Sequence, residues 1–193
     1  MSTGFRLASF GITCLGFIGL CAPLSSAQVA RTELHAIPTL TLSDRQFLIG
    51  GNGWETKAMP ANVRHVGHVF THEHNAFNCT PLAVLNIARD SMADIGFSPA
   101  TRVFEAAGAA ACLITDAWEG IELFLDPNEE VLVARDGKDV VEHLRELTSE
   151  RAHAIGQAAL RRVLSEHTYA HRGAEVDALL KREMASRLEE VAA

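Results

Sequence analysis

The chain is short of positive charge and of clustered cysteines. Its 17 Lys and Arg residues are outnumbered by 24 Asp and Glu residues, which gives a formal net charge of −7. A protein that holds nucleic acid through the phosphate backbone needs a basic surface, so this charge argues against a nucleic-acid partner. The 4 cysteines, Cys14, Cys21, Cys79 and Cys112, show no CxxC spacing, which argues against both a zinc site and a disulfide framework.

The remaining composition is that of an ordinary globular protein. A chain of 193 residues is long enough to bury one good-sized core. Hydrophobic residues make up 48% and charged residues 21%, and neither value is unusual for a folded domain. An anionic ligand stays compatible with the negative net charge, because a helix N-terminus and one or two arginines can hold a diphosphate.

Residues 1–30 form an apolar leader that differs from the rest of the chain. Residues 7–24 contain no charged side chain, and they lead into Ser25-Ser26-Ala27-Gln28. This pattern is that of a secretory signal cleaved after Ala27, and its length is near the ~18 residues of a spanning helix. An irregular start of the chain is the third interpretation. We expect the leader to stay outside the folded core, and residues 7–24 to be the segment through which any membrane association would occur.

From Gln46 onward, apolar segments with strand character alternate with segments of helical spacing. Residues 31–45 read as a linker, and residues 46–193 as one domain. Strands are expected at 46–49, 63–66, 81–88, 112–116 and 131–134, and helices at 72–77, 99–110 and 120–125. This alternation predicts an α/β fold, a single Rossmann-like domain built on a parallel sheet.

The C-terminal part of the chain reads as three successive helices. Asp136 is expected to cap the first, Ser149 with Glu150 to start the second, and Thr168 to cap the last. The tail over residues 174–191 is an amphipathic helix whose apolar face carries Val176, Leu179, Leu180, Met184 and Leu188.

One acidic residue stands out on the helix expected over 99–110. Pro99 can open this helix, because the N–H that it lacks would have no partner in the first turn. Glu105 lies among alanines and other apolar residues, where a carboxylate costs free energy unless it is paired. It is either a solvated residue on the polar face, where Arg102 is its i−3 neighbour, or a group that binds a ligand.

The motifs around Glu105 resemble the C-terminal half of group 1 glycosyltransferases of the GT-B fold, in particular the spore-maturation CgeB-like branch. That family has a Ser-Pro-x-x-Arg-x-Phe-Glu-Ala helix, then a strand ending in Asp, then a Trp-Glu-Gly turn. The matching residues here are Ser98, Pro99, Arg102, Phe104, Glu105, Ala106, Asp116, Trp118, Glu119 and Gly120. Segments 47–51, 62–69, 74–77, 130–133, 140–147 and 162–172 match in the same order, so the resemblance covers residues 46–190.

The resemblance implies a domain that binds a nucleotide diphosphate sugar as the donor substrate, in a cytoplasmic enzyme without metal ion or cofactor. The full enzyme would transfer the sugar to an acceptor hydroxyl. In such enzymes the acceptor and usually the catalytic base belong to a separate N-terminal domain, which is the protein partner that the resemblance implies. The alternative is a non-catalytic α/β binding or interaction module, exported or anchored through the leader.

The resemblance also implies which residues bind the donor. Glu105 matches the glutamate that accepts hydrogen bonds from the ribose hydroxyls, and Phe97 stands where the family has a second glutamate eight residues earlier. The expected substrate-binding set is Gly50, Gly51, Asn52, Gly53, His68, Arg102, Glu105, Trp118, Glu119 and Gly120. In this set the first glycines face the diphosphate, since glycine lets backbone N–H groups approach phosphate oxygens. For the loop at Gly50–Gly53, the alternative is a turn that needs glycine for steric reasons. For the loop at Trp118–Gly120, the alternative is a turn with a packed tryptophan.

Four histidines, His65, His68, His72 and His74, lie close together in the sequence. Their spacing does not place them on one helical face with a carboxylate, as a zinc protease motif would. We therefore expect no metal site. His68 or Asn75 near the nucleotide base, or histidines on the surface, are the alternatives.

Overall fold

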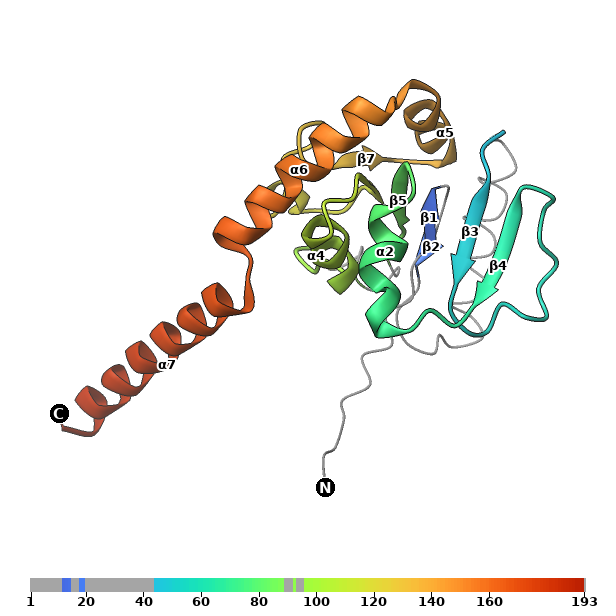
Figure 1. The fold of residues 1–193 in the computed structure, drawn as a ribbon. Helices are drawn as coiled ribbons and strands as arrows, with labels where there is room; N and C mark the ends of the chain where they lie inside the picture. Colours follow the sequence, from blue (N-terminus) through green and yellow to red (C-terminus); the bar gives the residue numbers. More distant parts are fainter. Residues whose placement is uncertain (1–11, 15–17, 20–43, 89–91, 93–95, 193) are drawn as a thin grey trace.

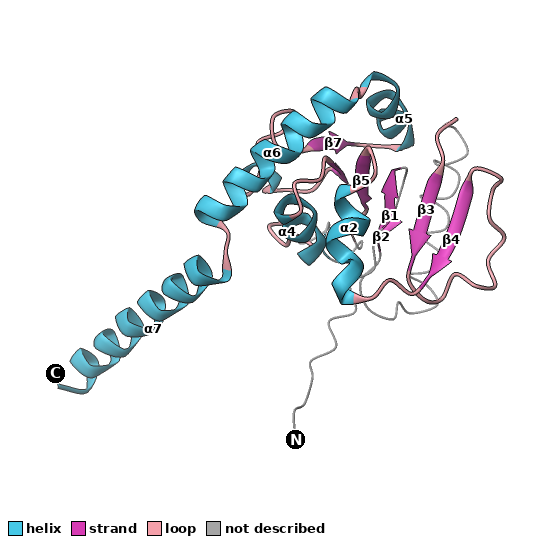
Figure 2. Ribbon diagram, in the orientation of Figure 1, coloured by secondary structure: helices cyan, strands magenta, loops and turns pink. Residues whose placement is uncertain are grey.

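The computed structural model describes residues 12–14, 18–19, 44–88, 92 and 96–192. The strands are β1 (Ile12–Cys14), β2 (Ile18–Gly19), β3 (Phe47–Gly50), β4 (Val63–Gly67), β5 (Ala83–Asn86), β6 (Leu113–Asp116) and β7 (Leu132–Ala134). The helices are η1 (Thr71–Glu73), α2 (His74–Cys79), α4 (Thr101–Gly108), η2 (Ile121–Leu123), α5 (Gly137–Glu146), α6 (Ser149–Glu166) and α7 (Tyr169–Ala192). The order of strands and helices confirms the predicted α/β class (Figure 2).

The strands of the domain pair in parallel. β6 lies between β5 and β7, with Leu85 opposite Ile114 and Ile114 opposite Leu132. β3 and β4 form a second parallel pair, in which Phe47 stands opposite Val63. The helix α2 carries the chain back from the end of β4 to the start of β5 (Figure 1). The parallel sheet of the prediction is thereby confirmed.

Two short segments of the leader join this sheet. β1 runs antiparallel to β5 with Cys14 opposite Ala83, and β2 runs parallel to β5 with Gly19 opposite Asn86. In Figure 1, β1 lies between β5 and β3. The expectation that the leader stays outside the core is therefore wrong for these two segments. The physical reason is that β1 and β2 form hydrogen bonds with the edge of β5, whose backbone groups would otherwise be unpaired. The rest of residues 1–30 lies outside the described residues.

Hydrophobic residues cover both faces of the sheet. On β5, Leu85 contributes to one buried cluster together with residues of α5 and the first half of α6. Its neighbour Val84 contributes to the other cluster, together with α4 and the second half of α6. Burial on both faces explains why the strand sequences are continuously apolar instead of alternating. The helix α6 packs so closely that a Cβ on Gly156 would lie 2.0 Å from the Ala110 carbonyl oxygen.

The starts of the three C-terminal helices follow the sequence. Asp136 accepts hydrogen bonds from the N–H groups of Lys138 and Asp139, and Thr168 accepts one from the N–H of His171. Helix α6 begins at Ser149 as expected, and Thr148 caps it. Helix α4 begins at Thr101 after the extended Ala100, so Pro99 precedes the helix and does not occupy its first turn.

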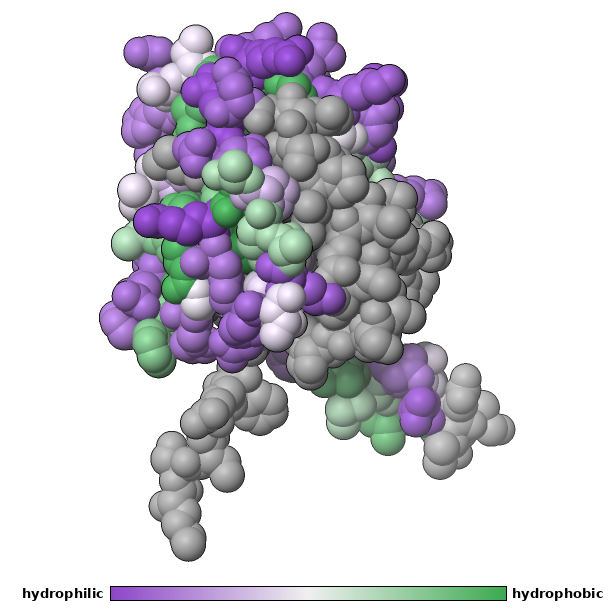
Figure 3. Space-filling view, turned by 90° about the vertical axis from the view of Figure 1, so that its right-hand side faces the viewer, coloured by the Kyte–Doolittle hydropathy of each residue, from purple (hydrophilic) through white to green (hydrophobic). Residues whose placement is uncertain are grey.

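Helix α7 extends away from the body of the domain (Figure 1). The predicted apolar stripe is present, and its side chains are exposed on this helix: Val176, Leu179, Leu180, Met184 and Leu188. Hydrophobic and hydrophilic side chains alternate over its surface where it leaves the body (Figure 3). Within the part of the chain that the structure describes, none of the helices combines the length and the hydrophobicity that crossing a membrane requires.

Candidate functional site

The expected donor-binding residues come from loops at the carboxyl edge of the sheet. Parallel strands end at the same edge, and ligands of open α/β sheets bind outside that edge. The loops that follow β3, β4, β5 and β6 there contain residues 50–53, 68–70, 96–97 and 116–120 respectively. Helix α4, which carries Glu105, starts from the same region (Figure 1).

The glycine loop after β3 is shaped by contacts within the protein. A Cβ on Gly50 would lie 2.6 Å from Val69 and 2.7 Å from Phe77. The Gly51 N–H donates to the Gly67 carbonyl at 2.7 Å, and the Gly53 N–H donates to the Glu55 carboxylate at 2.8 Å. These contacts favour the steric explanation of the glycine pattern, because two of the amides expected to face a phosphate already have acceptors.

A buried chain of polar side chains links β5, β6 and the first turn of α4. Arg102 is only 3% exposed, and its Nη1 donates to Asn86 Oδ1 at 3.3 Å. Asn86 Nδ2 donates to Thr115 Oγ1 at 3.0 Å, and Thr115 Oγ1 donates to Asp116 Oδ1 at 3.2 Å. Asp116 also accepts from the Ala88 N–H at 2.9 Å. Arg102 thus lies beneath the carboxyl edge, so it is held by the protein's own groups and does not lie on a solvated face.

Asn86 and Thr115 were not expected as site residues. Both are fully buried, and both stand at the carboxyl ends of apolar strands. A polar residue that follows an apolar run at this end of a strand was the available signal, since a buried amide or hydroxyl needs a hydrogen-bonding partner.

Glu105 lies three residues after Arg102 on α4 and is half-buried. Its neighbours on the helix, Ala106 and Ala107, are buried in the core. The carboxylate therefore sits at the boundary between the core and the surface of the domain. That position suits an acceptor of two ribose hydroxyls, because an ionised carboxylate has acceptor oxygens and no donor.

The loops after β5 and β6 touch each other at two consecutive pairs of residues. The Phe97 N–H donates to the Glu119 carbonyl at 2.6 Å. A Cβ on Gly120 would lie 2.4 Å from the Phe97 ring, and a Cβ on Gly96 would lie 3.0 Å from Glu119 Cβ. Gly96, Phe97 and Gly120 all have positive φ angles, of 69°, 50° and 93°. Glycine is the residue that adopts this conformation at low cost, so the two glycines are required by the contact itself.

Trp118 packs inward from the same turn. It is 7% exposed, and its ring centroid lies 5.9 Å from that of Phe124. Phe124 in turn packs against Phe104, the residue before Glu105. This burial favours the packed-tryptophan alternative over a contact between Trp118 and the substrate. The packed Trp118 side chain stabilises the loop that follows β6.

His167, at the junction of α6 and α7, packs against the rings of Phe104 and Phe124. Its Nε2–H donates to the Phe124 carbonyl at 3.0 Å, and its Nδ1 accepts from Arg172 Nη2 at 2.6 Å. Burial lowers the pKa of His167, and the positive charges of Arg172 and Arg162 lower it further. The neutral ring therefore fastens the helix junction to the loop after β6. A groove of about 440 Å³ runs beside it, lined by residues of this junction.

The histidines around β4 have separate partners. His65 Nε2–H donates to the Gly51 carbonyl at 2.6 Å, and His74 Nε2–H to the Val69 carbonyl at 3.3 Å. His68 and His72 are exposed, with the Phe70 ring between them. Among the described residues, no three His, Cys, Asp or Glu side chains are grouped so that they could hold a metal ion.

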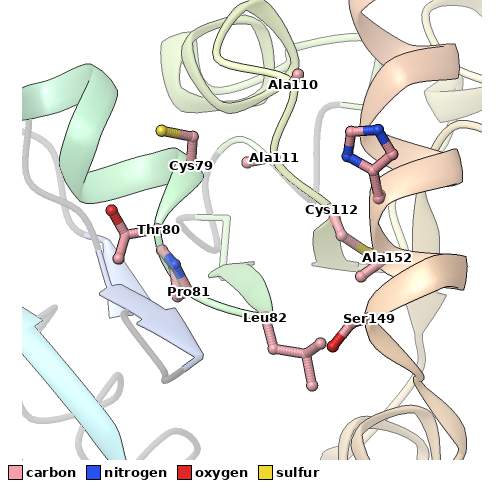
Figure 4. A pocket seen from close by; sticks show the side chains of 10 residues that line it. Cys79, Thr80, Pro81, Leu82, Ala110, Ala111, Cys112, Ser149 and Ala152 are labelled. Carbon is pink, nitrogen blue, oxygen red and sulfur yellow. The ribbon is translucent and has the colours of Figure 1, made fainter.

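A cavity of about 320 Å³ lies at the opposite edge of the sheet. Figure 4 shows it between the end of α2 at Cys79, the turn at Ala110–Cys112 and the start of α6 at Ser149. Burial raises the pKa of the Cys112 thiol to about 12, so this sulfur is a packing group and not a nucleophile. Because the lining segments 79–82 and 110–112 precede β5 and β6, the cavity is separate from the loops described above.

Comparisons with known proteins agree with this arrangement. A family model described as glycosyl transferase-like matches residues 31–178. None of the curated proteins matches the chain. Sucrose-phosphate synthase from Thermosynechococcus elongatus is similar in structure, with a TM-score of 0.59 at 14% sequence identity over 88% of this chain and 38% of the synthase. The crystal structure of TarM gives a TM-score of 0.55 at 12% identity, over 91% of this chain and 36% of TarM.

The two structural neighbours are GT-B glycosyltransferases, and this chain spans less than two fifths of the length of either. At such low identity the likeness establishes the fold. The family model, by contrast, covers most of the chain, and this chain accordingly belongs to the glycosyl transferase-like family.

Proposed function

We propose that residues 46–193 bind a nucleotide diphosphate sugar at the carboxyl edge of the sheet and form the donor-binding domain of a glycosyltransferase. The observation that carries this proposal is the position of Glu105, half-buried on α4 three residues after Arg102, which belongs to the buried polar network. Family membership supports a sugar-transfer reaction, and the position of Glu105 supports a nucleotide ligand. The CgeB-like branch is the subfamily that we propose on the motifs around Glu105.

The proposed role of Glu105 is to accept hydrogen bonds from the two ribose hydroxyls of the donor. The ribose would then lie over the start of α4, between the loops that follow β5 and β6. Arg102 would contribute from beneath this position, because its guanidinium is buried and bonded to Asn86. We propose no metal ion and no cofactor for the reaction, in which the sugar passes to an acceptor hydroxyl.

We also propose that an N-terminal domain supplies the acceptor site. Support comes from the structural neighbours, of which this chain covers 38% and 36%. In a two-domain enzyme of this kind, closure around the donor expels water and assembles the catalytic groups. A cytoplasmic location follows for an enzyme that uses nucleotide sugars, and it is proposed on that ground alone.

Calorimetric titration of UDP and GDP into the chain tests the proposal. Wild type is expected to bind at least one of them, and Glu105→Gln is expected to weaken that binding by ~1.5–3 kcal/mol, the size of a lost charged hydrogen bond. Glu129→Gln is the matched control, since Glu129 is exposed in the loop before β7, at the other edge of the sheet. Equal affinities for wild type and Glu105→Gln would contradict the role of Glu105, and binding of neither nucleotide would contradict the proposed function.

A further inference from the structure

Phe97 combines two features that are unfavourable for a residue without a function. Its backbone is left-handed, with φ of 50°. That conformation is uncommon for a bulky side chain, and glycine, asparagine or aspartate adopts it at lower cost. In addition, its side chain is 54% exposed, so hydrophobic burial recovers only part of the conformational cost. Strained residues of this kind gather at ligand sites, where surrounding contacts hold them in place.

The surrounding contacts hold the Phe97 ring in one position. The Phe97 N–H bond to the Glu119 carbonyl fixes its backbone. One side of the ring lies against Gly120, where a Cβ would approach to 2.4 Å from a ring carbon. Glycine at position 120 therefore makes room for this ring. The rest of the Phe97 side chain is exposed to solvent.

A carboxylate stands beside the residue that precedes Phe97. Glu119 Oε2 lies 3.3 Å from the position that a Cβ on Gly96 would occupy, and Gly96 is the residue before Phe97. An aromatic face carries partial negative charge, to which the partly positive C–H groups of a pyranose ring are attracted. The hydroxyls at the rim of such a ring are donors that a carboxylate accepts. An aromatic ring on one loop and a carboxylate on the facing loop are thus complementary to a hexose.

We propose that Phe97 is the platform on which the hexosyl group of the donor stacks, with Glu119 accepting one of its hydroxyls. This inference rests on the proposed function, and it adds the part of the site that distinguishes a nucleotide sugar from a bare nucleotide. The ribose is held by Glu105 on α4, and the sugar by the two loops that follow β5 and β6. Phe97 therefore determines specificity for the transferred group, and Glu105 for the nucleotide.

The test compares each nucleotide sugar with its own nucleotide diphosphate. The probes are UDP with UDP-glucose and UDP-N-acetylglucosamine, and GDP with GDP-mannose, titrated by calorimetry. Phe97→Asn is the principal variant, because asparagine tolerates the left-handed backbone and the variant is expected to melt at or above the wild-type temperature. Phe97→Tyr keeps the aromatic face. Leu164→Ala is the matched control, since Leu164 is 60% exposed on α6, away from the two loops.

We expect Phe97→Asn to weaken binding of the nucleotide sugar by about threefold to tenfold, the range of an aromatic stack. Binding of the nucleotide diphosphate should stay within about twofold of wild type, and Phe97→Tyr and Leu164→Ala should behave as wild type does. Unchanged binding of every nucleotide sugar by Phe97→Asn would overturn the platform while leaving the proposed function intact. An equal loss for nucleotide and nucleotide sugar would also overturn it, because the ring would then contact the nucleotide. A wild type that binds no probe overturns the proposed function and this inference together.

Discussion

Replacing Asn86 by alanine should destabilise the domain strongly, because Asn86 connects three elements from a fully buried position. Its Oδ1 accepts from the Arg102 guanidinium, and its Nδ2 donates to Thr115. A hydrogen bond to a charged group contributes ~1.5–3 kcal/mol and one between neutral groups ~0.5–1.5 kcal/mol. Partial relaxation reduces the sum, so we expect Asn86→Ala to lower the free energy of unfolding by about 2–4 kcal/mol. That is a large share of the roughly 5–15 kcal/mol that stabilises a typical domain.

Urea unfolding followed by circular dichroism measures this loss. With a slope of roughly 2 kcal/mol/M for a small domain, the expected loss moves the midpoint down by about 1–2 M. Asn75→Ala is the control, because Asn75 is exposed on α2 and its loss should change the free energy by no more than about 0.5 kcal/mol. A shift for Asn86→Ala as small as that of the control would refute the view that this network ties α4 to the sheet.

Two further predictions concern the helix junction and the leader. The lowered pKa of His167 means that the folded state binds this proton less readily than the unfolded state does. Its contribution to stability is therefore complete above about pH 6.5 and is lost as the pH falls from there toward the lowered pKa. His167→Gln should make the free energy of unfolding, measured in urea melts, depend less on pH in this range. His153→Gln, an exposed control on α6, should leave that pH dependence unchanged. A chain beginning at Thr32 lacks β1 and β2, so it should lose more than ~2 kcal/mol of unfolding free energy, well above a surface effect, and an unchanged melt would show that β5 does not need these partners.

The repeating part of the fold was predictable because it depends on local patterns. The apolar runs at 81–88 and 112–116 correspond to β5 and β6, and both are shorter in the structure than the runs themselves. Asp136 caps α5 as expected, since an aspartate before a helix can bond the free N–H groups of its first turn. Strands and helix caps of this kind depend on residues that are close together in the sequence, so the sequence alone is enough to predict them.

The parts that were not predictable depend on contacts between distant segments. Arg102 looks like a solvent-exposed helical residue until Asn86, sixteen positions away, is brought beneath it. The glycines after β3 look like a phosphate cradle until Gly67 and Glu55 take up two of their amides. Phe97 looks like a simple departure from the family pattern until its ring is found against Gly120. Asn86, Gly67 and Gly120 each lie on a different strand or loop from the residue that they contact.

The pairing of β1 with β5 connects the leader to the proposed site. β1 lies between β5 and β3 in Figure 1, and thus between the strand that leads to the loop at Gly50–Gly53 and the strand that leads to the Phe97 loop and to helix α4. β1 is hydrogen-bonded to β5 and lies beside β3, which pairs with β4 in a separate sheet. Removal of β1 takes away the strand that spaces the two sheets at this point. We therefore expect loss of the leader to weaken nucleotide binding even in a chain that remains folded, because the effect of a contact depends on how closely its groups are positioned.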